Sequence, residues 1–160
     1  MIEFTVFGTP APQGSKKFVG TDNAGRGILV ESSKKVKPWR MDVKEAAEAA
    51  RKAHGCTLDG PLVVAMVFTV KKPGSAPKSR QTWPDRMPDL SKLLRSTEDA
   101  ITDAGLWADD ARVVRYDKLA KVFPGEDPDA LAAPGVRVRI SQVAQVARPM
   151  LPQLELLAEV

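Results

Sequence analysis

The feature that most constrains the fold is the run from Pro61 to Val70, which is apolar apart from one threonine. Its length and its β-branched residues favour a strand, and its lack of alternation indicates a strand that is buried on both faces. Such a strand needs paired neighbours and a covering layer on each side. The run has about half the length of a membrane-spanning helix, so we expect no membrane partner.

The rest of the chain supplies the other elements. Alternating and helical patterns predict further strands at 2–7, 112–123 and 136–140, and helices from about Pro38 to Ala53 and from Asp89 to about Ala104. Residues 8–14, 14–33, 71–87 and 124–134 are typical of loops, with only a hint of a short strand at 27–30. The predicted fold is α+β: one compact domain of order β-α-β-α-β-β, whose mixed sheet is packed by two helices. A tail follows from residue 143.

Cysteine and histidine are too scarce for several kinds of site. The one cysteine excludes an internal disulfide, and the single histidine, His54, argues against zinc. His54 falls in the last turn of a predicted helix, where it complements the helix dipole, and this is a poor context for a Ser-His-Asp triad. A metal ion would therefore be held by carboxylates, which favours magnesium or manganese.

Charge is distributed unevenly along the 160 residues, whose formal net charge is +4. Basic residues dominate the first third and the segment 71–95, whereas acidic residues crowd 98–117. An enzyme that holds a cation against a polyanion would have this pattern, and so would a solvated surface with uneven charge. The basic residues that we expect to contact phosphate lie in predicted loops or at element ends: Lys16, Lys17, Lys34, Lys35, Lys71, Lys72, Lys78 and Arg80.

The segment from Asp89 to Asp110 carries the candidate chemistry. Asp89 is placed to cap the second helix, and Asp109 and Asp110 follow about twenty residues later. A helix of about 15 residues is about 22 Å long, so the chain must return along the helix before these carboxylates can meet. Without that return they are separate surface groups.

This segment resembles the RusA-like family of Holliday-junction resolvases. The family signature is matched at Asp89, Leu90, Leu93, Asp99, Ala100, Gly105, Trp107, Asp109 and Asp110. The resemblance covers roughly residues 1–142, a nuclease domain that leaves 143–160 as a tail. It implies a homodimer in the cytoplasm of a bacterial or phage-infected cell. This dimer would bind four-way DNA junctions and make paired cuts that depend on Mg²⁺, for which Mn²⁺ can substitute.

The resemblance assigns metal binding and catalysis to Asp89 and Asp110, with Asp109 beside them. Three positions close to Asp89 depart from the signature. Ser91 replaces the second aspartate, followed by Lys92 in place of asparagine, and Arg95 replaces the lysine. Arg95 can stabilise charge in the transition state but cannot serve as a base. Either another carboxylate, Asp99 or Glu98, compensates for Ser91, or cleavage is weak or lost.

Three functions remain open from the sequence. The first is the junction endonuclease, the second is a junction-binding module that has lost efficient cleavage through Ser91, and the third is a basic domain with an unrelated protein partner. Asp99 and Arg95 can also form an ordinary surface ion pair. The three tryptophans are expected in the core, although Trp83, in a basic loop, is the best placed to stack on a base. The apolar tail around Leu151, Leu154 and Leu157 is expected to pack on its own domain or in a dimer.

Overall fold

The computed structural model describes residues 1–14, 16–31 and 34–143, and at its centre is a four-stranded mixed sheet. The strands lie in the order β1-β6-β4-β5. Their bounds are Ile2–Phe7 for β1, Leu62–Thr69 for β4, Val113–Val122 for β5 and Gly135–Gln142 for β6. β4 is parallel to β5 and antiparallel to β6, and β1 is antiparallel to β6. The apolar run therefore forms an inner strand, which confirms the prediction.

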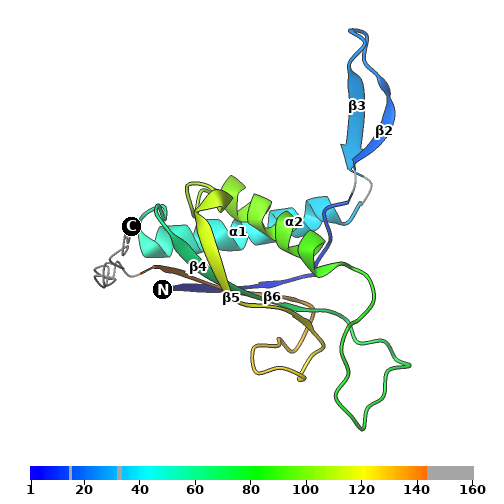
Figure 1. The fold of residues 1–160 in the computed structure, drawn as a ribbon, viewed down its shortest axis with the longest axis vertical. Helices are drawn as coiled ribbons and strands as arrows, with labels where there is room; N and C mark the ends of the chain where they lie inside the picture. The colour runs from blue at the N-terminus through cyan, green and yellow to red at the C-terminus, as the bar shows by residue number, and fades with distance from the viewer. Residues whose placement is uncertain (15, 32–33, 144–160) are drawn as a thin grey trace, which may run out of the picture.

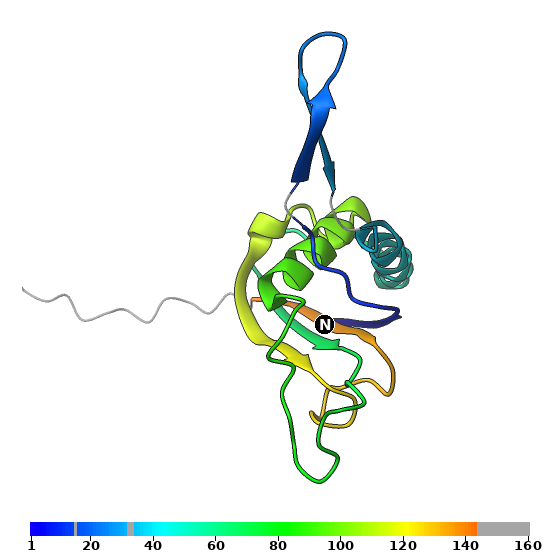
Figure 2. The ribbon, with the colours of Figure 1, turned by 90° about the vertical axis from the view of Figure 1, so that its right-hand side faces the viewer.

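Two helices cover one face of the sheet, as Figures 1 and 2 show: α1 (Val36–His54) and α2 (Leu90–Asp103). α1 ends at Gly55, whose φ of 90° only glycine adopts without strain and whose N–H donates to the Arg51 carbonyl. The two helices are joined by a buried hydrogen bond from Trp39 Nε1 to Thr97 Oγ1, 3.2 Å long. The core between helices and sheet is formed mainly by large apolar side chains: Trp39, Val43, Leu62, Val64, Met66, Phe68, Leu93 and Ile101.

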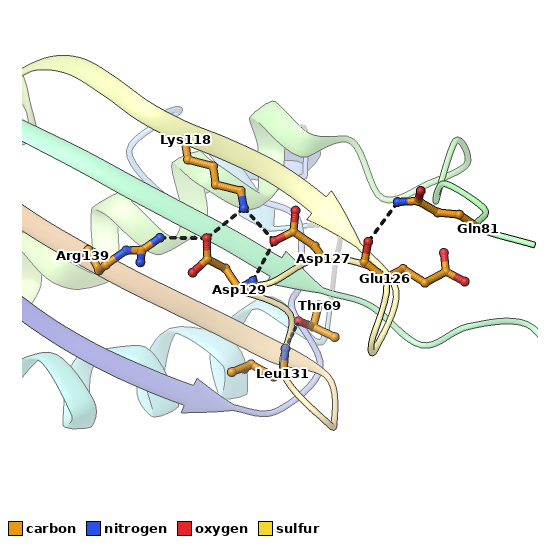
Figure 3. Close-up of polar contacts among 8 residues, drawn as sticks. All are labelled: Thr69, Gln81, Lys118, Glu126, Asp127, Asp129, Leu131 and Arg139. Carbon is orange, nitrogen blue, oxygen red and sulfur yellow. Dashed lines mark hydrogen bonds and ion pairs between the residues drawn. The ribbon is translucent and has the colours of Figure 1, made fainter.

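The segment after β5 crosses the opposite face of the sheet (Figure 1). There the Leu131 N–H donates to Thr69 Oγ1 at 2.8 Å, and Lys118 bridges Asp127 and Asp129 at 2.6 and 2.8 Å (Figure 3). The β4 residues that point to this face are also buried, Val63 to 6% exposure and Val67 to 1%. β4 is thus covered on both faces, as its continuous hydrophobicity predicts.

Residues 14–33 correct one expectation, because they contain a β-hairpin instead of a loop. β2 (Lys16–Thr21) pairs with β3 (Gly27–Glu31) in a sheet of two strands, and the hairpin projects from the body of the molecule (Figures 1 and 2). Its turn is held by the Asp22 carboxylate, which accepts N–H groups of Ala24 and Arg26 at 2.9 and 2.8 Å. Gly20 and a register shift beside it break the alternation along β2, which removes the pattern that would have predicted a strand.

The six predicted elements otherwise occur in the predicted order, which confirms the α+β class with two helices on a mixed sheet. A short 3₁₀ helix, η1 (Asp110–Arg112), lies between α2 and β5. In the described part of the chain, no helix has the length and hydrophobicity needed to cross a membrane. The expectations for Leu151, Leu154 and Leu157 concern positions outside the described residues, and the domain boundary at residue 142 stays a prediction.

Candidate active site

Asp89 begins the candidate site, at the N-cap position of α2. Its side chain is half exposed and makes an ion pair with Lys92 Nζ at 3.0 Å, and it makes no capping hydrogen bond. The predicted position is therefore right, but the predicted capping bond is wrong. Asp89 is a carboxylate that faces solvent and whose charge is offset by one surface lysine.

Ser91, Arg95 and Glu98 follow along one stripe of α2. Their spacing of four and then three residues stacks them on the same side of the helix. Ser91 and Arg95 are exposed, and Glu98 is partly buried. Within the described residues, neither the Ser91 hydroxyl nor the Arg95 guanidinium has a hydrogen-bond or ion-pair partner. A neutral hydroxyl and an uncommitted cation thus lie between the two ends of the site.

The turn after α2 brings Asp110 to the far end of this stripe, near Glu98. Asp109 is the N-cap of η1, and its carboxylate accepts the Ala111 N–H at 2.8 Å. Asp110 is exposed, and in the part of the chain that the structure describes its carboxylate is not engaged in a hydrogen bond or ion pair. Glu98 accepts a hydrogen bond from the Tyr116 hydroxyl on β5. Of the two adjacent aspartates, Asp110 is the one with a carboxylate open to a ligand.

The electrostatics at Glu98 reflect this crowding of acidic groups. Burial raises the pKa of Glu98; the Tyr116 hydrogen bond lowers it, and the charges of Asp110 and Asp99 raise it again. Burial and the bond to Glu98 likewise raise the pKa of Tyr116. Glu98 and Asp110 therefore repel each other, and a positive charge placed beside both would relieve that repulsion.

The structure does not gather all the predicted carboxylates at one point. Glu98 lies nine positions after Asp89, which corresponds to about 13 Å along the helix axis. Among residues 1–14, 16–31 and 34–143, no three His, Cys, Asp or Glu side chains are grouped closely enough to hold a metal ion. Asp110 lies near enough to Glu98 for its charge to raise the Glu98 pKa, while Asp89 lies at the other end of the stripe with Ser91 and Arg95 between them.

Asp99 belongs to a different edge of α2 and does not form the ion pair with Arg95 that the sequence left open. Asp99 instead pairs with Arg40 of α1 at 3.5 Å, and Arg40 also pairs with Asp103 at 2.6 Å. The reason is geometric: α1 packs beside this edge of α2 and supplies the nearer cation. Of the two carboxylates that the sequence offers as substitutes at position 91, only Glu98 faces the stripe.

The predicted phosphate contacts occupy three places. Lys16 and Lys17 lie on β2 and Lys34 and Lys35 directly before α1, with Lys34 and Lys35 exposed. The basic loop, residues 71–88, contains the others, among which Lys72 is ion-paired with Glu126. The hairpin and the basic loop project from opposite ends of the long axis (Figure 2). In that loop the basic side chains that are exposed are Lys71, Lys78, Arg80 and Arg86.

A cleft of about 1000 Å³ opens between the basic loop and the body of the domain. Its lining includes Arg80, Trp83, Arg86 and Met87 from the loop and Phe123 from the end of β5. Trp83 is 61% exposed, so the expectation of a core position is wrong for this tryptophan, whereas Trp39 and Trp107, each 1% exposed, confirm it. The cleft lies next to the N-terminal end of α2, away from the Glu98 end of the stripe.

Comparison with protein-family models matches residues 8–141 to the family described as endodeoxyribonuclease RusA. The chain belongs to the RusA family. The match includes the whole stretch from Asp89 to Asp110, and it supports a Holliday-junction-resolving endonuclease in general. A search of curated proteins finds no match to the chain.

Three side chains around the RusA-family segment escaped sequence reasoning. Tyr116 binds Glu98, while Lys121 and Glu126 contact the basic loop. Tyr116 could have been suggested by its place in a strand that follows the helix in a β-α-β unit. Nothing local marks Lys121 or Glu126, because their partners lie more than thirty positions away in sequence.

Proposed function

We propose that this RusA-family protein is a magnesium-dependent, structure-selective endonuclease that resolves four-way DNA junctions by paired phosphodiester cuts. The observation that carries the proposal is the family match over the segment whose exposed carboxylate, Asp110, lies beside Glu98 and Tyr116. The basic loop next to the start of α2 adds a surface for the DNA backbone.

The chemical type of the ligand atoms offered by the proposed site suits magnesium. Asp110 and Glu98 offer only carboxylate oxygens, and Asp110 is exposed, so positions would remain for water and phosphate. We propose Asp110 and Glu98 as ligands at one end of the stripe and Asp89 at the other, with Asp109 as a neighbour engaged in its own turn. A bound magnesium ion would lower the pKa of an attacking water and offset charge that develops on the phosphate.

The remaining residues of the stripe would act on the phosphate and on the ligands. Arg95 is exposed and has no ion-pair partner among the described residues, so it can pair with a phosphate oxygen, which stabilises the transition state without any proton transfer. The Tyr116 hydroxyl fixes the orientation of the Glu98 carboxylate by donating to it. Lys92 offsets the charge of Asp89 and so reduces its repulsion of approaching DNA.

We further propose that the protein acts as a homodimer. A four-way junction has two-fold symmetry, and paired cuts in opposing strands are made most simply by a protein with the same symmetry. Sedimentation at micromolar concentration, with and without junction DNA, should give the mass of two chains. A monomer under both conditions would refute the dimer.

Ser91 supports a second candidate function, a junction-binding module without efficient cleavage. A serine hydroxyl is a poor magnesium ligand compared with the carboxylate at this position of the family signature. DNA binding by the basic loop would survive this loss, because phosphate contacts do not depend on the metal site.

One experiment separates the candidates: a labelled four-way junction and a matched linear duplex are incubated with the protein, with and without Mg²⁺ or Mn²⁺. The endonuclease cuts the junction only with metal, and Asp110→Asn and Glu98→Gln abolish cutting while they preserve binding. Asp103→Asn is the matched control, since that carboxylate also lies on α2 but pairs with Arg40 at 2.6 Å.

The outcomes of this experiment differ for each candidate. Cleavage by Asp110→Asn near the parent rate would remove Asp110 from the site. Binding without cleavage in either metal would establish the binding module. Equal affinity for the junction and the linear duplex would exclude both candidate functions. A thermal melt of each variant shows whether it is folded.

A further inference from the structure

The basic loop is tied to the turn after β5 through one residue, Glu126 (Figure 3). The Glu126 carboxylate pairs with Lys72 Nζ and accepts the Thr82 N–H at 2.9 Å, and its backbone carbonyl accepts Gln81 Nε2–H at 3.0 Å. The Glu126 side chain is only 14% exposed. A single residue thus contacts the loop near its start and near its middle.

Lys121, at the end of β5, holds the last part of the same loop. Its ammonium group donates to the carbonyls of Arg86 and Pro88 at 2.6 and 2.7 Å. Pro88 directly precedes Asp89, the first residue of the candidate active site. The loop is therefore fixed at its start, middle and end by side chains from β5 and the turn that follows it.

The basic loop needs such restraint because it has no regular secondary structure. A loop of this length that is free to move must lose conformational entropy when it binds a partner, and pre-ordering removes that cost from the binding step. The exposed charges of the loop are almost all positive, with Asp85 the only acidic residue among 71–88. Its chemistry therefore favours a polyanion.

We propose that Glu126 is a positioning residue that holds the basic loop in the shape that receives the DNA backbone. Lys72 serves this purpose from within the loop, as the ion-pair partner of Glu126, and is not itself a phosphate contact. Hydrogen bonds from Lys72 and Thr82 hold the pKa of Glu126 below its ordinary value, so the carboxylate is ionised at neutral pH. The inference rests on the proposed DNA-binding function.

The direction in which DNA affinity changes when Glu126 is replaced distinguishes a positioning role from a purely electrostatic one. Glu126 is an anion in a DNA-facing region, so on charge alone its removal should tighten DNA binding, and alanine and glutamine should act equally. Positioning predicts the opposite: Glu126→Ala weakens junction binding by about three- to tenfold, since the loop must then be ordered on binding. Glu126→Gln keeps an oxygen that can accept the Thr82 N–H, so it should lie between the parent and Glu126→Ala.

The test measures junction affinity over a range of salt concentrations for the parent, Glu126→Ala and Glu126→Gln. The slope of affinity against salt should not change, because no phosphate contact is lost. Glu48→Gln is the matched control: Glu48 is also a glutamate paired with a lysine, Lys44 at 3.9 Å, but it lies on α1. It should not weaken binding. Tighter or unchanged binding by Glu126→Ala would overturn the proposal.

A second measurement needs no DNA. Hydrogen exchange of the Thr82 amide, which donates to Glu126, should lose protection in Glu126→Ala but not in Glu48→Gln. Unchanged exchange would show that Glu126 does not hold the basic loop in place. If the parent binds no junction at all, the proposed function fails and the DNA part of this inference fails with it. The exchange result then decides separately whether Glu126 orders the loop.

Discussion

Replacing Ser91 with aspartate would restore the carboxylate that the family signature has at this position. Ser91 is the second residue of α2 and is exposed, so the new side chain can be accommodated without repacking the core. If this position faces a metal ion, the added ligand should raise the single-turnover cleavage rate about tenfold or more. A tenfold rise corresponds to about 1.4 kcal/mol of transition-state stabilisation. Without metal, the extra negative charge should weaken DNA binding.

The structure also fixes what Ser91→Asp should do to stability, independently of catalysis. The first turn of α2 contains no acidic residue, so a carboxylate there interacts favourably with the helix dipole, by about 0.3–1 kcal/mol. Arg95, one turn further on and without an ion-pair partner in the described part of the chain, adds about 0.2–0.5 kcal/mol, and repulsion from nearby Asp89 removes a similar amount. The net gain is then about 0.3–1 kcal/mol, which raises Tm by about 1–4 °C for a chain of this size.

Calorimetry and single-turnover assays on the same preparations provide the test, with Ser91→Asn as the control of equal shape and no charge. Suppose that the parent cleaves junctions and that Ser91→Asp is more stable but cleaves no faster. The site is then built around other carboxylates, and Glu98 is the first to examine. Inactivity of parent and variant in both Mg²⁺ and Mn²⁺ would refute the enzyme and leave the binding module. Loss of stability in Ser91→Asp would contradict the helix-terminus argument.

Other predictions concern packing, phosphate contact and pH. Thr97→Val leaves the buried Trp39 Nε1–H without its acceptor and should cost about 1–3 kcal/mol in urea unfolding, whereas Thr97→Ser keeps the bond and should cost less. Lys71→Ala should reduce the salt slope of junction binding by about one unit. Lys72→Ala should leave the slope unchanged, since that ammonium is ion-paired with Glu126, and equal reductions in the two variants would show that the pair opens on DNA. Hydrogen bonds from Lys118 and Arg139 hold the pKa of Asp129 below its ordinary value. The contribution of ionised Asp129 to the free energy of unfolding is therefore complete above about pH 4, and it is lost as the pH falls through the pKa that Asp129 has in the folded protein. The difference in stability between the parent and Asp129→Asn should accordingly disappear in acid.

Secondary structure could be predicted from the sequence where burial gives the apolar residues a regular local spacing. The central strand, both helices and the glycine that ends α1 could be predicted because each depends on side chains a few positions apart. The hairpin could not, since Gly20 and the register shift erase alternation in β2. Its stability depends on a turn closed by Asp22, a side-chain role that composition alone does not reveal.

The ion pairs and hydrogen bonds of the candidate site were harder to predict than the place of the site in the sequence. Asp89 and Asp110 could be singled out from spacing and resemblance, yet the packing of α1 decides that Asp99 pairs with Arg40, 59 positions away, and not with its helical neighbour. Glu98 lies on the stripe by its helical spacing, but its hydrogen bond with Tyr116 depends on how β5 packs beside the helix. Such contacts depend on tertiary structure, so no regular spacing of residues in the sequence predicts them.

The pairing of β1 with β6 joins the two ends of the domain, since Ile2 lies opposite Ile140. A ribosome must therefore complete nearly the whole domain before the first strand can find its partner. Closing a loop of about 130 residues costs about 2 kcal/mol more entropy than closing one of ten. Contacts of such long range slow folding, so β1 should be among the last strands to join the sheet. Until then the edge of β6 stays open, and chains that end before residue 135 cannot close the sheet at all.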